Sequence, residues 1–581
     1  ERLLDVLDEA LEARVLVHSP RTRRRLQFSH ALVRDTLYDE LGDGKRARLH
    51  RAAGEALERL YAGDPGAHLT ELAHHFAEAA TRGDAAKAVD YARRAGDRAA
   101  GMLAFEEAVR LYRLALESLD AGDPATRCEL LLAMGDAKMR AGDESGAKAS
   151  LREVAAIARE QDAPEQLARA ALGYGGRFLW GRAGADPQLV PLLEDALAHL
   201  DERHPELRAK VLGRLATALR DQPRRDRRAA LAEEAVAVAR DLGDDATLAY
   251  ALEARFEATE AADNIREHVA QLPEMFALAR ASGDVERLIV CHEVSLHTTL
   301  QLGDAASALP HYDEMTRLAE ELHQPAHDWL MTAWRAVLDV MRGAFASAEE
   351  LIEQGRELGR QAQSWNAEVS YRVSTYVLRK QQGQLAEIEE LLEQSVAEYG
   401  VLPRFQCMLA SAYAELGRRE AAARACDALL AEDLESWHVD TEWLFAMTEL
   451  AEAVVLLDDE HRAARLYPVL LPYARLNAVA PVEAVTGSTA RVLGMLAAAL
   501  GRFDEAERHF EHALEANERL GARPWVAHTK HQHARMLLRR AAAGDAERAH
   551  ALLEGARRDY EELGMKSWAE RARDTVPPAL A

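Results

Sequence analysis

Apolar residues recur along most of this chain at the spacing of one face of an α-helix, and short turns separate the helices. The clearest unit is residues 492–520, in which two apolar stripes flank a turn that begins at Gly501. The second stripe has the i, i+4, i+7, i+8 spacing, at Ala506, Phe510, Ala513 and Leu514. This spacing predicts two helices packed as a hairpin, and glycine permits the positive φ that ends the first helix.

The same kind of turn, a glycine followed five residues later by a small or apolar residue, recurs along the chain. It begins at Gly83, Gly142, Gly303, Gly343, Gly383, Gly417, Gly501 and Gly544. Several of these turns lie about 40 residues apart, a period typical of helical-hairpin repeats. One hairpin cannot bury its apolar face alone, whereas stacked hairpins form a superhelix with a concave face. We therefore predict an all-α, α-solenoid fold over residues 65–575.

The first 60 residues have a different pattern. Helical spacing from Leu3 to Ala13 is followed by two strand-like segments, residues 14–17 and 26–28, with a turn signal at Ser19–Thr22 between them. Ser29 can cap a helix over residues 30–41, and a further helix is expected over residues 45–60. Helix, β-hairpin and helix in this order predict the end of a winged-helix module.

Two stretches interrupt the repeat register. Residues 172–190 are rich in glycine and aromatic residues, and residues 468–490 contain three prolines and Gly487. We expect both to be irregular loops, and loops on a rigid scaffold are frequent binding sites. The aromatic residues near such stretches are our candidates for ligand contacts, with core packing as the alternative for each: Tyr174, Phe178, Trp180, Trp329, Trp334 and Trp365.

Composition supports this picture. The 581 residues exceed the roughly 250–300 at which single cores stop growing, so the chain is an array or several domains. A net charge of -25 disfavours nucleic acid as a general partner. The basic cluster of Arg21, Arg23, Arg24 and Arg25 could be a DNA-contacting wing, a solvated turn or a docking surface for the acidic repeats. The four cysteines form no CxxC pair and no uncharged run reaches the ~20 residues of a membrane span, so we expect a cytoplasmic protein.

Two segments carry a family resemblance. The hairpin at Leu493–Leu520 resembles a tetratricopeptide repeat. Residues 28–38 (FSHALVRDTLY) with 46–50 (RARLH), and residues 501–510 (GRFDEAERHF) with 521–525 and 534–538, resemble parts of large bacterial signal-transduction ATPases. This group comprises the STAND ATPases, among them LuxR-type regulators and ATPases fused to adenylate/guanylate cyclase domains.

The resemblance implies the order effector, P-loop NTPase, winged helix and repeats, of which this chain would hold the last two. It has no GxxxxGK[ST] motif and no initiator Met, so we expect ATP or ADP to bind upstream, in a longer parent protein. The resemblance also assigns His30, with Arg34 one turn later, a role in sensing the nucleotide state. The alternative for His30 is helix capping or interdomain packing.

No other pattern predicts catalysis. His528, His531 and His533, with His509 and His512, cluster in sequence, but their spacing does not define a zinc site, and we predict no metal. The Gly-rich stretch 173–184 lacks the preceding strand that a nucleotide loop requires, and a hydrolase there is only a third alternative. We predict a non-enzymatic sensor region that binds a protein or small inducer in the concave groove, needs no cofactor of its own and contacts the upstream NTPase. The alternative is a stand-alone interaction scaffold.

Overall fold

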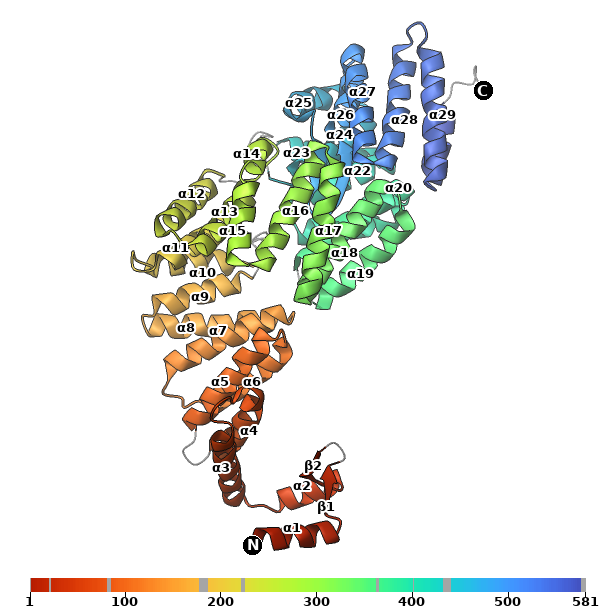
Figure 1. Cartoon of the computed structure of the whole chain (residues 1–581). Helices are drawn as coiled ribbons and strands as arrows, with labels where there is room; N and C mark the ends of the chain where they lie inside the picture. Colours follow the sequence, from red (N-terminus) through yellow and green to blue (C-terminus); the bar gives the residue numbers. More distant parts are fainter. Residues whose placement is uncertain are drawn as a thin grey trace. The chain divides into compact units, whose positions relative to one another are not determined.

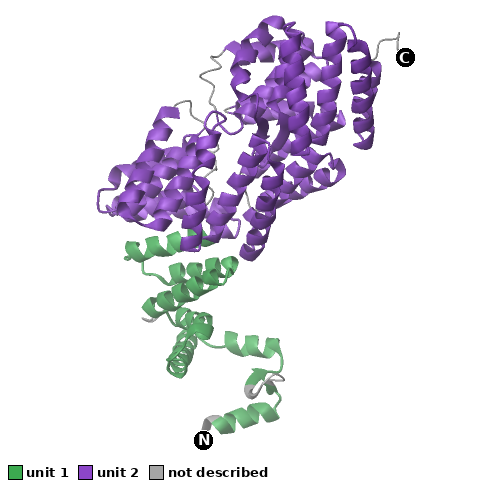
Figure 2. Ribbon diagram, turned by 45° about the horizontal axis from the view of Figure 1, so that its top comes forward, with its two compact units in different colours: residues 1–137 green, residues 138–581 purple. Residues whose placement is uncertain are grey.

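The structure is a computed structural model that describes residues 2–19, 22–80, 85–176, 186–220, 225–361, 365–400, 402–431 and 440–575. The chain forms two compact units, residues 1–137 and residues 138–581, coloured green and purple in Figure 2. Both consist mainly of helices (Figure 1), which confirms the predicted all-α fold. The division lies near the C-terminal end of the helix Pro124–Arg140, and the boundary that the sequence pattern places after residue 60 stays a prediction.

Unit 1 begins with the small helix–hairpin–helix module and continues into helical hairpins. Its elements are α1 (Arg2–Glu12), β1 (Leu16–Ser19), β2 (Thr22–Phe28), α2 (Ala31–Asp39), α3 (Asp43–Leu60), η1 (Gly66–His68), α4 (Leu69–Ala79), α5 (Ala85–Gly101), α6 (Phe105–Ser118) and most of α7 (Pro124–Arg140). The strands β1 and β2 pair in antiparallel fashion, with Leu16 opposite Phe28. These elements follow the predicted order, but β1 begins two residues later and β2 four residues earlier than expected, and the N-cap of α2 is His30 rather than Ser29. The assignment to a winged-helix module stays a prediction.

Unit 2 contains the larger array. Its elements up to residue 431 are α8 (Glu144–Glu160), α9 (Pro164–Tyr174), α10 (Leu189–His199), α11 (Pro205–Ala218), α12 (Arg225–Leu242), α13 (Asp245–Thr259), α14 (Ile265–Val269), α15 (Leu272–Ser282), α16 (Val285–Leu302), α17 (Ala305–Leu322), α18 (Pro325–Arg342), α19 (Phe345–Gln361), α20 (Trp365–Gln382), η4 (Leu385–Ile388), α21 (Glu389–Glu398), α22 (Pro403–Glu415) and α23 (Arg419–Ala431). The remaining elements are α24 (Trp443–Leu456), α25 (Glu460–Leu470), η5 (Leu471–Tyr473), β3 (Asn477–Ala480), β4 (Ala484–Ser488), α26 (Thr489–Ala499), α27 (Phe503–Leu520), α28 (Arg523–Arg540), α29 (Asp545–Glu562) and α30 (Lys566–Asp574).

The predicted turns have the expected geometry. Each repeat glycine in the described part of the chain has a positive φ, at Gly142, Gly303, Gly343, Gly383, Gly417, Gly501 and Gly544. The alanine five residues after the turn is fully buried wherever it is present, as Ala308, Ala348 and Ala506 illustrate. Small side chains at this position let the two helices of a hairpin approach closely, as predicted from the sequence.

One set of helices in unit 2 is buried on nearly every side. All residues of α26 are buried, as are most residues of α18 and α24. Their partners α17, α19, α25 and α27 bury only one stripe each. Helices that are apolar all round lie inside a larger assembly. The inner helices are therefore covered both by their hairpin partners and by residues on their other face.

A buried β-hairpin supplies much of that cover. β3 and β4 pair in antiparallel fashion, and every residue of both strands is buried. The hairpin contacts α16, α18, α20, α24, α26, α27 and α28. The expectation of an irregular loop over residues 468–490 is therefore wrong. Alanine and valine occupy most strand positions, and their small apolar side chains fit a space enclosed by helices.

Burying this hairpin requires partners for its backbone, because an unsatisfied buried peptide group is costly. Ser370 Oγ donates to the carbonyl of Val482 at 2.6 Å, and Ser374 Oγ donates to that of Glu483 at 2.9 Å. At the other end, the amide of Ser488 donates to Asn517 Oδ1 at 2.8 Å. Asn477 Nδ2 in turn donates to the carbonyl of Leu300, near the end of α16. Polar side chains of α20 and α27 thus take the place of water around the hairpin backbone.

The other interruption differs from its prediction at its start. Helix α9 continues to Tyr174, so residues 172–174 are helical rather than part of a loop. The helix α10 then begins at Leu189. Residues 177–185, which include Phe178 and Trp180, lie outside the described residues.

Candidate functional site

A polar cavity of about 40 Å³ lies inside unit 2, at the tip of the β3–β4 hairpin. Helices α13, α16, α18 and α20 form most of its wall, and the segments after α11 and before α24 complete it. Five glutamates line it: Glu257, Glu260, Glu293, Glu442 and Glu483. A space of this size holds a few water molecules or a small polar group.

Helix periodicity brings the first three carboxylates together. Glu257 lies in the last turn of α13 and Glu260 is the C-cap residue that directly follows this helix, while Glu293 lies four residues before His297 on α16. Residues four positions apart share one face of a helix. This face of α16 and the end of α13 are turned to the interior, and each of these four side chains is buried.

Each of these carboxylates has one defined partner. Arg220 Nη1 donates to Glu257 Oε2 at 3.2 Å. His297 Nε2 lies 3.0 Å and 3.1 Å from the two carboxylate oxygens of Glu260. Trp334 Nε1 donates to Glu293 Oε1 at 3.3 Å. On the opposite wall, Arg404 Nη2 donates to Glu483 Oε1 at 2.9 Å.

The crowding of carboxyl groups changes their protonation. Burial, with a minor contribution from Glu293 and Glu260, raises the pKa of Glu257 to about 8 despite the opposing charge of Arg220. Burial also raises the pKa of Glu293. Burial opposes the charged form of His297, but Glu260, Glu293 and Glu257 together raise its pKa to about 9. At neutral pH the cavity therefore contains a protonated Glu257 next to a protonated His297.

The hairpin tip is held in an unusual conformation. Val482 has a φ of 57°, a region that β-branched residues rarely occupy. Its carbonyl accepts from Ser370, and both residues line the cavity. Such backbone strain persists only where the surrounding structure fixes it. The packing of the tip against α20 thus determines the shape of the cavity.

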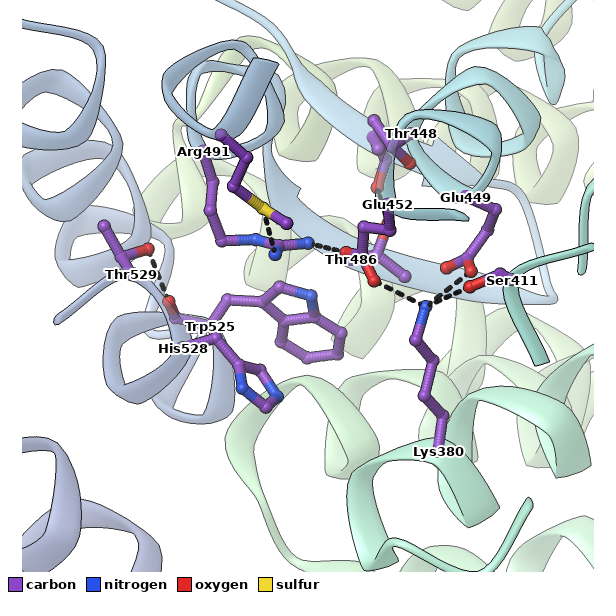
Figure 3. Close-up of polar contacts among 12 residues, drawn as sticks. Lys380, Ser411, Thr448, Glu449, Glu452, Thr486, Arg491, Trp525, His528 and Thr529 are labelled. Atoms are coloured by element: carbon purple, nitrogen blue, oxygen red, sulfur yellow. Dashed lines mark hydrogen bonds and ion pairs between the residues drawn. The ribbon is translucent and has the colours of Figure 1, made fainter. Parts of the chain in front are cut away.

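A second buried polar cluster lies further along the inner helices (Figure 3). Lys380 on α20 contacts Glu449 and Glu452 on α24 at 2.5 Å and 2.7 Å, and Arg491 on α26 also pairs with Glu452. Burial opposes the charge of Lys380, but the two carboxylates hold its pKa well above the usual value. The adjacent pair of Arg571 and Glu415 adds one cation and one carboxylate. The cluster therefore contains equal numbers of cationic and carboxylate side chains. This cluster joins α20, α24, α26 and α30 and is a structural network.

The structure places the candidate aromatic residues differently. Trp329 is 2% exposed and forms part of the cavity wall. Trp334 is fully buried and holds Glu293. Tyr174 is buried in unit 2, where Lys148 lies 5.5 Å from its ring centre, away from this cavity's lining. The side chain of Trp365 lies outside the described part, as do Phe178 and Trp180.

The candidate nucleotide-sensing residues lie in unit 1. His30 is the N-cap of α2, and its Nδ1 accepts the amide of Leu32 at 3.4 Å. Arg34 pairs with the neighbouring Asp35, and both side chains are exposed. This geometry matches the capping alternative for His30 and leaves the side chain at the surface, so the sensing role stays a prediction. The side chains of Arg21, Arg23, Arg24 and Arg25 lie outside the described residues.

The clustered histidines of α28 are buried core residues. His528 contacts Tyr560 and Gln381, both at 2.9 Å. His531 contacts Thr575 at 3.1 Å, and the ring of His533 stacks on Phe510. Burial lowers the pKa values of all three, so they are neutral at pH 7. In the part of the chain that the structure describes, no group of three or more His, Cys, Asp or Glu residues could hold a metal ion.

Sequence reasoning missed the cavity glutamates. A signal was present, because Glu253 and Glu257 lie one turn apart on α13, whose other residues are mostly apolar, and Glu260 caps its end. Carboxylates on a face that must be buried are rare unless they are paired. The other charged residues at the cavity, Arg404, Glu442 and Glu483, lie far from α13 in the sequence. Only the fold therefore shows that these residues form one site.

Comparison with known proteins identifies one repeat. The family model of the tetratricopeptide repeat matches residues 492–519, which form α26 and α27. No curated protein sequence matches the chain. Solved structures with similarity include yeast Tom70, at 12% identity and a TM-score of 0.32 over 84% of this chain and 97% of that one. A chain of the APC/C hetero-tetramer Cut9–Hcn1 has 14% identity and a TM-score of 0.43, with coverage of 92% and 98%.

A third similar structure is a signal transduction ATPase with numerous domains (STAND) that has a tetratricopeptide repeat sensor, from Pyrococcus horikoshii. It has 13% identity and a TM-score of 0.29, and the match covers 80% of this chain and 59% of that one. Among the described helices of this chain, none is long and apolar enough to cross a membrane.

Proposed function

We propose that this chain is the ligand-sensing regulatory region of a multidomain signal-transduction ATPase whose output is transcription or cyclic-nucleotide synthesis. The cavity at the hairpin tip is the observation that carries the proposal. It is lined mainly by polar side chains, it lies among helical repeats, and its lining extends from Arg220 to Glu483 in sequence. Convergent polar groups in a concave space are a common feature of small-ligand sites.

The position of the cavity suggests how binding could act on an attached enzyme. A bound molecule would contact α13, α16 and the β3–β4 hairpin together, and so would favour one relative arrangement of the repeats. Such a ligand shifts a conformational equilibrium only by its difference in affinity for the two states. The family resemblance implies that the NTPase switches between an ADP-bound state and an ATP-bound state. In this account, ligand binding to the repeats changes the equilibrium between these two states.

Unit 1 would be the connection to the NTPase. Its helix–hairpin–helix module precedes the repeats in the order that the resemblance implies. His30 lies exposed at the N-terminus of α2. Backbone amides at a helix N-terminus favour a phosphate group. These features support a nucleotide contact made together with an upstream domain.

Calorimetry of nucleotide binding tests this function. Residues 1–581 would be compared with the natural protein extended upstream through its NTPase region. We expect ATP and ADP to bind only the longer chain, and His30→Ala to weaken its ADP affinity about tenfold or more, the equivalent of one charge-assisted contact. His18→Ala, an exposed histidine on β1, is the matched control. If neither chain binds nucleotide, the alternative of a stand-alone interaction scaffold replaces this proposal.

A further inference from the structure

The β3–β4 hairpin lies on the inner face of the repeat array, where the sequence predicts that a ligand or partner binds. It contacts α16, α18, α20, α24, α26 and α28. Several of these are the first helices of packed pairs, such as α16–α17, α18–α19 and α28–α29 (Figure 1). Helices so far apart in the chain contact one short hairpin because the array curves around it. Stacked repeats bind their partners on such concave surfaces, and in this chain that part of the surface is already occupied.

The inner helices hold the hairpin by its main chain. Ser370 and Ser374 on α20 donate to the backbone carbonyls of Val482 and Glu483, at 2.6 Å and 2.9 Å. In the recognition of extended peptides, main-chain hydrogen bonds supply affinity and pockets for side chains supply specificity. The two serines therefore form contacts that any extended segment in this position would make.

Side-chain contacts define which segment this groove accepts. Arg404 Nη2 donates to Glu483 Oε1 at 2.9 Å, which favours an acidic residue at the tip. At the other end, Gly487 has a φ of 76°, and a Cβ there would lie 2.6 Å from Asn517 Oδ1. Most other strand positions hold small apolar side chains, all of them buried: Ala478, Val479, Ala480, Ala484 and Val485. The groove thus fits an extended segment of small apolar residues with one carboxylate.

We infer that the β3–β4 hairpin is an autoinhibitory segment, which occupies the groove in place of an extended segment of a partner protein. The partner segment has the chemistry that the groove selects, small apolar residues with one carboxylate, and it binds when the hairpin leaves the inner helices. This inference goes beyond the proposed function, because it concerns a protein partner and needs no upstream NTPase. Peptide binding and nucleotide calorimetry therefore test the two independently.

Release of the hairpin begins at its tip. The cavity of about 40 Å³ lies there, so the tip fills its part of the groove incompletely. Val482 at the tip has a φ of 57°, a strained conformation that persists only while the surrounding structure holds it. The opposite end fits more closely. Asn477 Nδ2 donates to the carbonyl of Leu300, and the amide of Ser488 donates to Asn517 Oδ1, both at 2.8 Å.

Fluorescence anisotropy with a labelled, capped peptide of residues 478–487 tests the inference on residues 1–581. The natural chain should bind this peptide weakly, because the apparent affinity is reduced by the small fraction of molecules with an open groove. Glu483→Gln in the chain removes the carboxylate that Arg404 holds and keeps its shape. This variant weakens only the chain's own hairpin. We therefore expect it to bind the natural peptide tenfold to a hundredfold more tightly, the range for a charge-assisted hydrogen bond.

Two controls separate this effect from a general loss of stability. Arg404→Gln weakens the contact with the chain's own hairpin and with the added peptide alike, so its affinity for the peptide should stay close to that of the natural chain. A peptide with glutamine at the position of Glu483 should lose the gain that the natural peptide shows with the Glu483→Gln chain. Circular dichroism would confirm that each variant is folded.

Hydrogen exchange of the natural chain tests the inference without any variant. An autoinhibitory hairpin opens while the array stays folded, so amides of β4 should exchange through an opening of lower free energy than those of α24 and α26. Equal protection of β4 and these helices would overturn the inference, because the hairpin would then be a permanent part of the core. Equal peptide affinity of the natural and Glu483→Gln chains would overturn it too. An equal gain in Arg404→Gln would place the peptide outside the groove and refute the inference.

Discussion

Ser370 Oγ donates a 2.6 Å hydrogen bond to the backbone carbonyl of Val482, a residue 112 positions later in the chain. This bond fixes the tip of a buried β-hairpin against an inner helix of the repeat array. Both residues also line the polar cavity. The arrangement links the stability of the hairpin to the shape of the candidate binding site.

Removal of the Ser370 hydroxyl should therefore destabilise unit 2. Ser370→Ala leaves the Val482 carbonyl buried without this donor, and the expected loss is about 1–3 kcal/mol of unfolding free energy. Ser282→Ala is the control, because that hydroxyl bonds only to carbonyls of its own helix, α15. We expect the control to change stability by less than about 0.5 kcal/mol. Urea unfolding followed by circular dichroism measures both, and equal effects would contradict the role of the hairpin contact.

The contribution of Glu257 and His297 to the stability of unit 2 should fall as the pH rises from about 5 to about 9. Glu257 has a pKa raised to about 8, so above its unfolded value of 4.5 the folded state binds more protons than the unfolded state. His297, with a pKa raised to about 9, acts in the same direction above pH 6.5. When the unfolded state binds fewer protons, the free energy of unfolding decreases with increasing pH.

Glu257→Gln separates the two groups. This variant cannot ionise at position 257, so its stability relative to the natural chain should improve as the pH rises through 8. The shift of a pKa by one unit corresponds to about 1.4 kcal/mol, which makes the change measurable by urea unfolding between pH 5 and pH 9. A constant difference between the two proteins over that range would show that Glu257 is already ionised in the folded state.

Much of the fold could be predicted because repeat periodicity is local. Gly501, Ala506 and Phe510 lie within ten residues, and their spacing alone predicts the turn and the helix–helix contact. The buried hairpin could not be predicted, because Val479 and Val485 acquire their surroundings from helices up to about two hundred residues away. The cavity was missed for the same reason. Trp329 and Trp334 were selected from sequence as aromatic candidates, but the glutamates they adjoin were not.

Close helix packing provides a direct test of the repeat at residues 492–519. A Cβ added at Gly494 on α26 would lie 2.9 Å from the ring of Phe510, which is 1% exposed. Gly494→Ala should therefore destabilise the protein by about 1–3 kcal/mol, the usual cost of overpacking. At Gly555 on α29 the nearest atom is the flexible Lys530 side chain at 3.5 Å. There, Gly555→Ala should stabilise the helix by up to about 1 kcal/mol. Thermal unfolding of the two variants would contradict this packing if both changed in the same direction.

The N-terminal unit should respond to acid. His50 Nδ1 lies 2.9 Å from His75 Nδ1, and His50 Nε2 lies 2.9 Å from the hydroxyl of Tyr38 on α2. Burial, followed by the neighbouring histidines, lowers the pKa values of His50 and His75. Since the unfolded chain then binds more protons, the stability of unit 1 should fall as the pH drops below 6.5.

Limited proteolysis of residues 1–137 in the full chain would detect this change. We expect cleavage between α2 and α4 to accelerate between pH 6.5 and pH 5. His75→Gln should reduce the acceleration, because it removes one titrating partner. His68→Gln, at a histidine that pairs with Glu71 instead, should leave it unchanged. Identical pH profiles for all three proteins would exclude the His50–His75 contact as the cause.

Hydrogen exchange of residues 1–581 tests most directly the central claim that the Ser370–Val482 hydrogen bond holds the hairpin tip and with it the wall of the cavity. We predict faster amide exchange in β3 and β4 of Ser370→Ala than in the natural chain, and unchanged exchange there in Ser282→Ala. Equal exchange in all three proteins would contradict the claim.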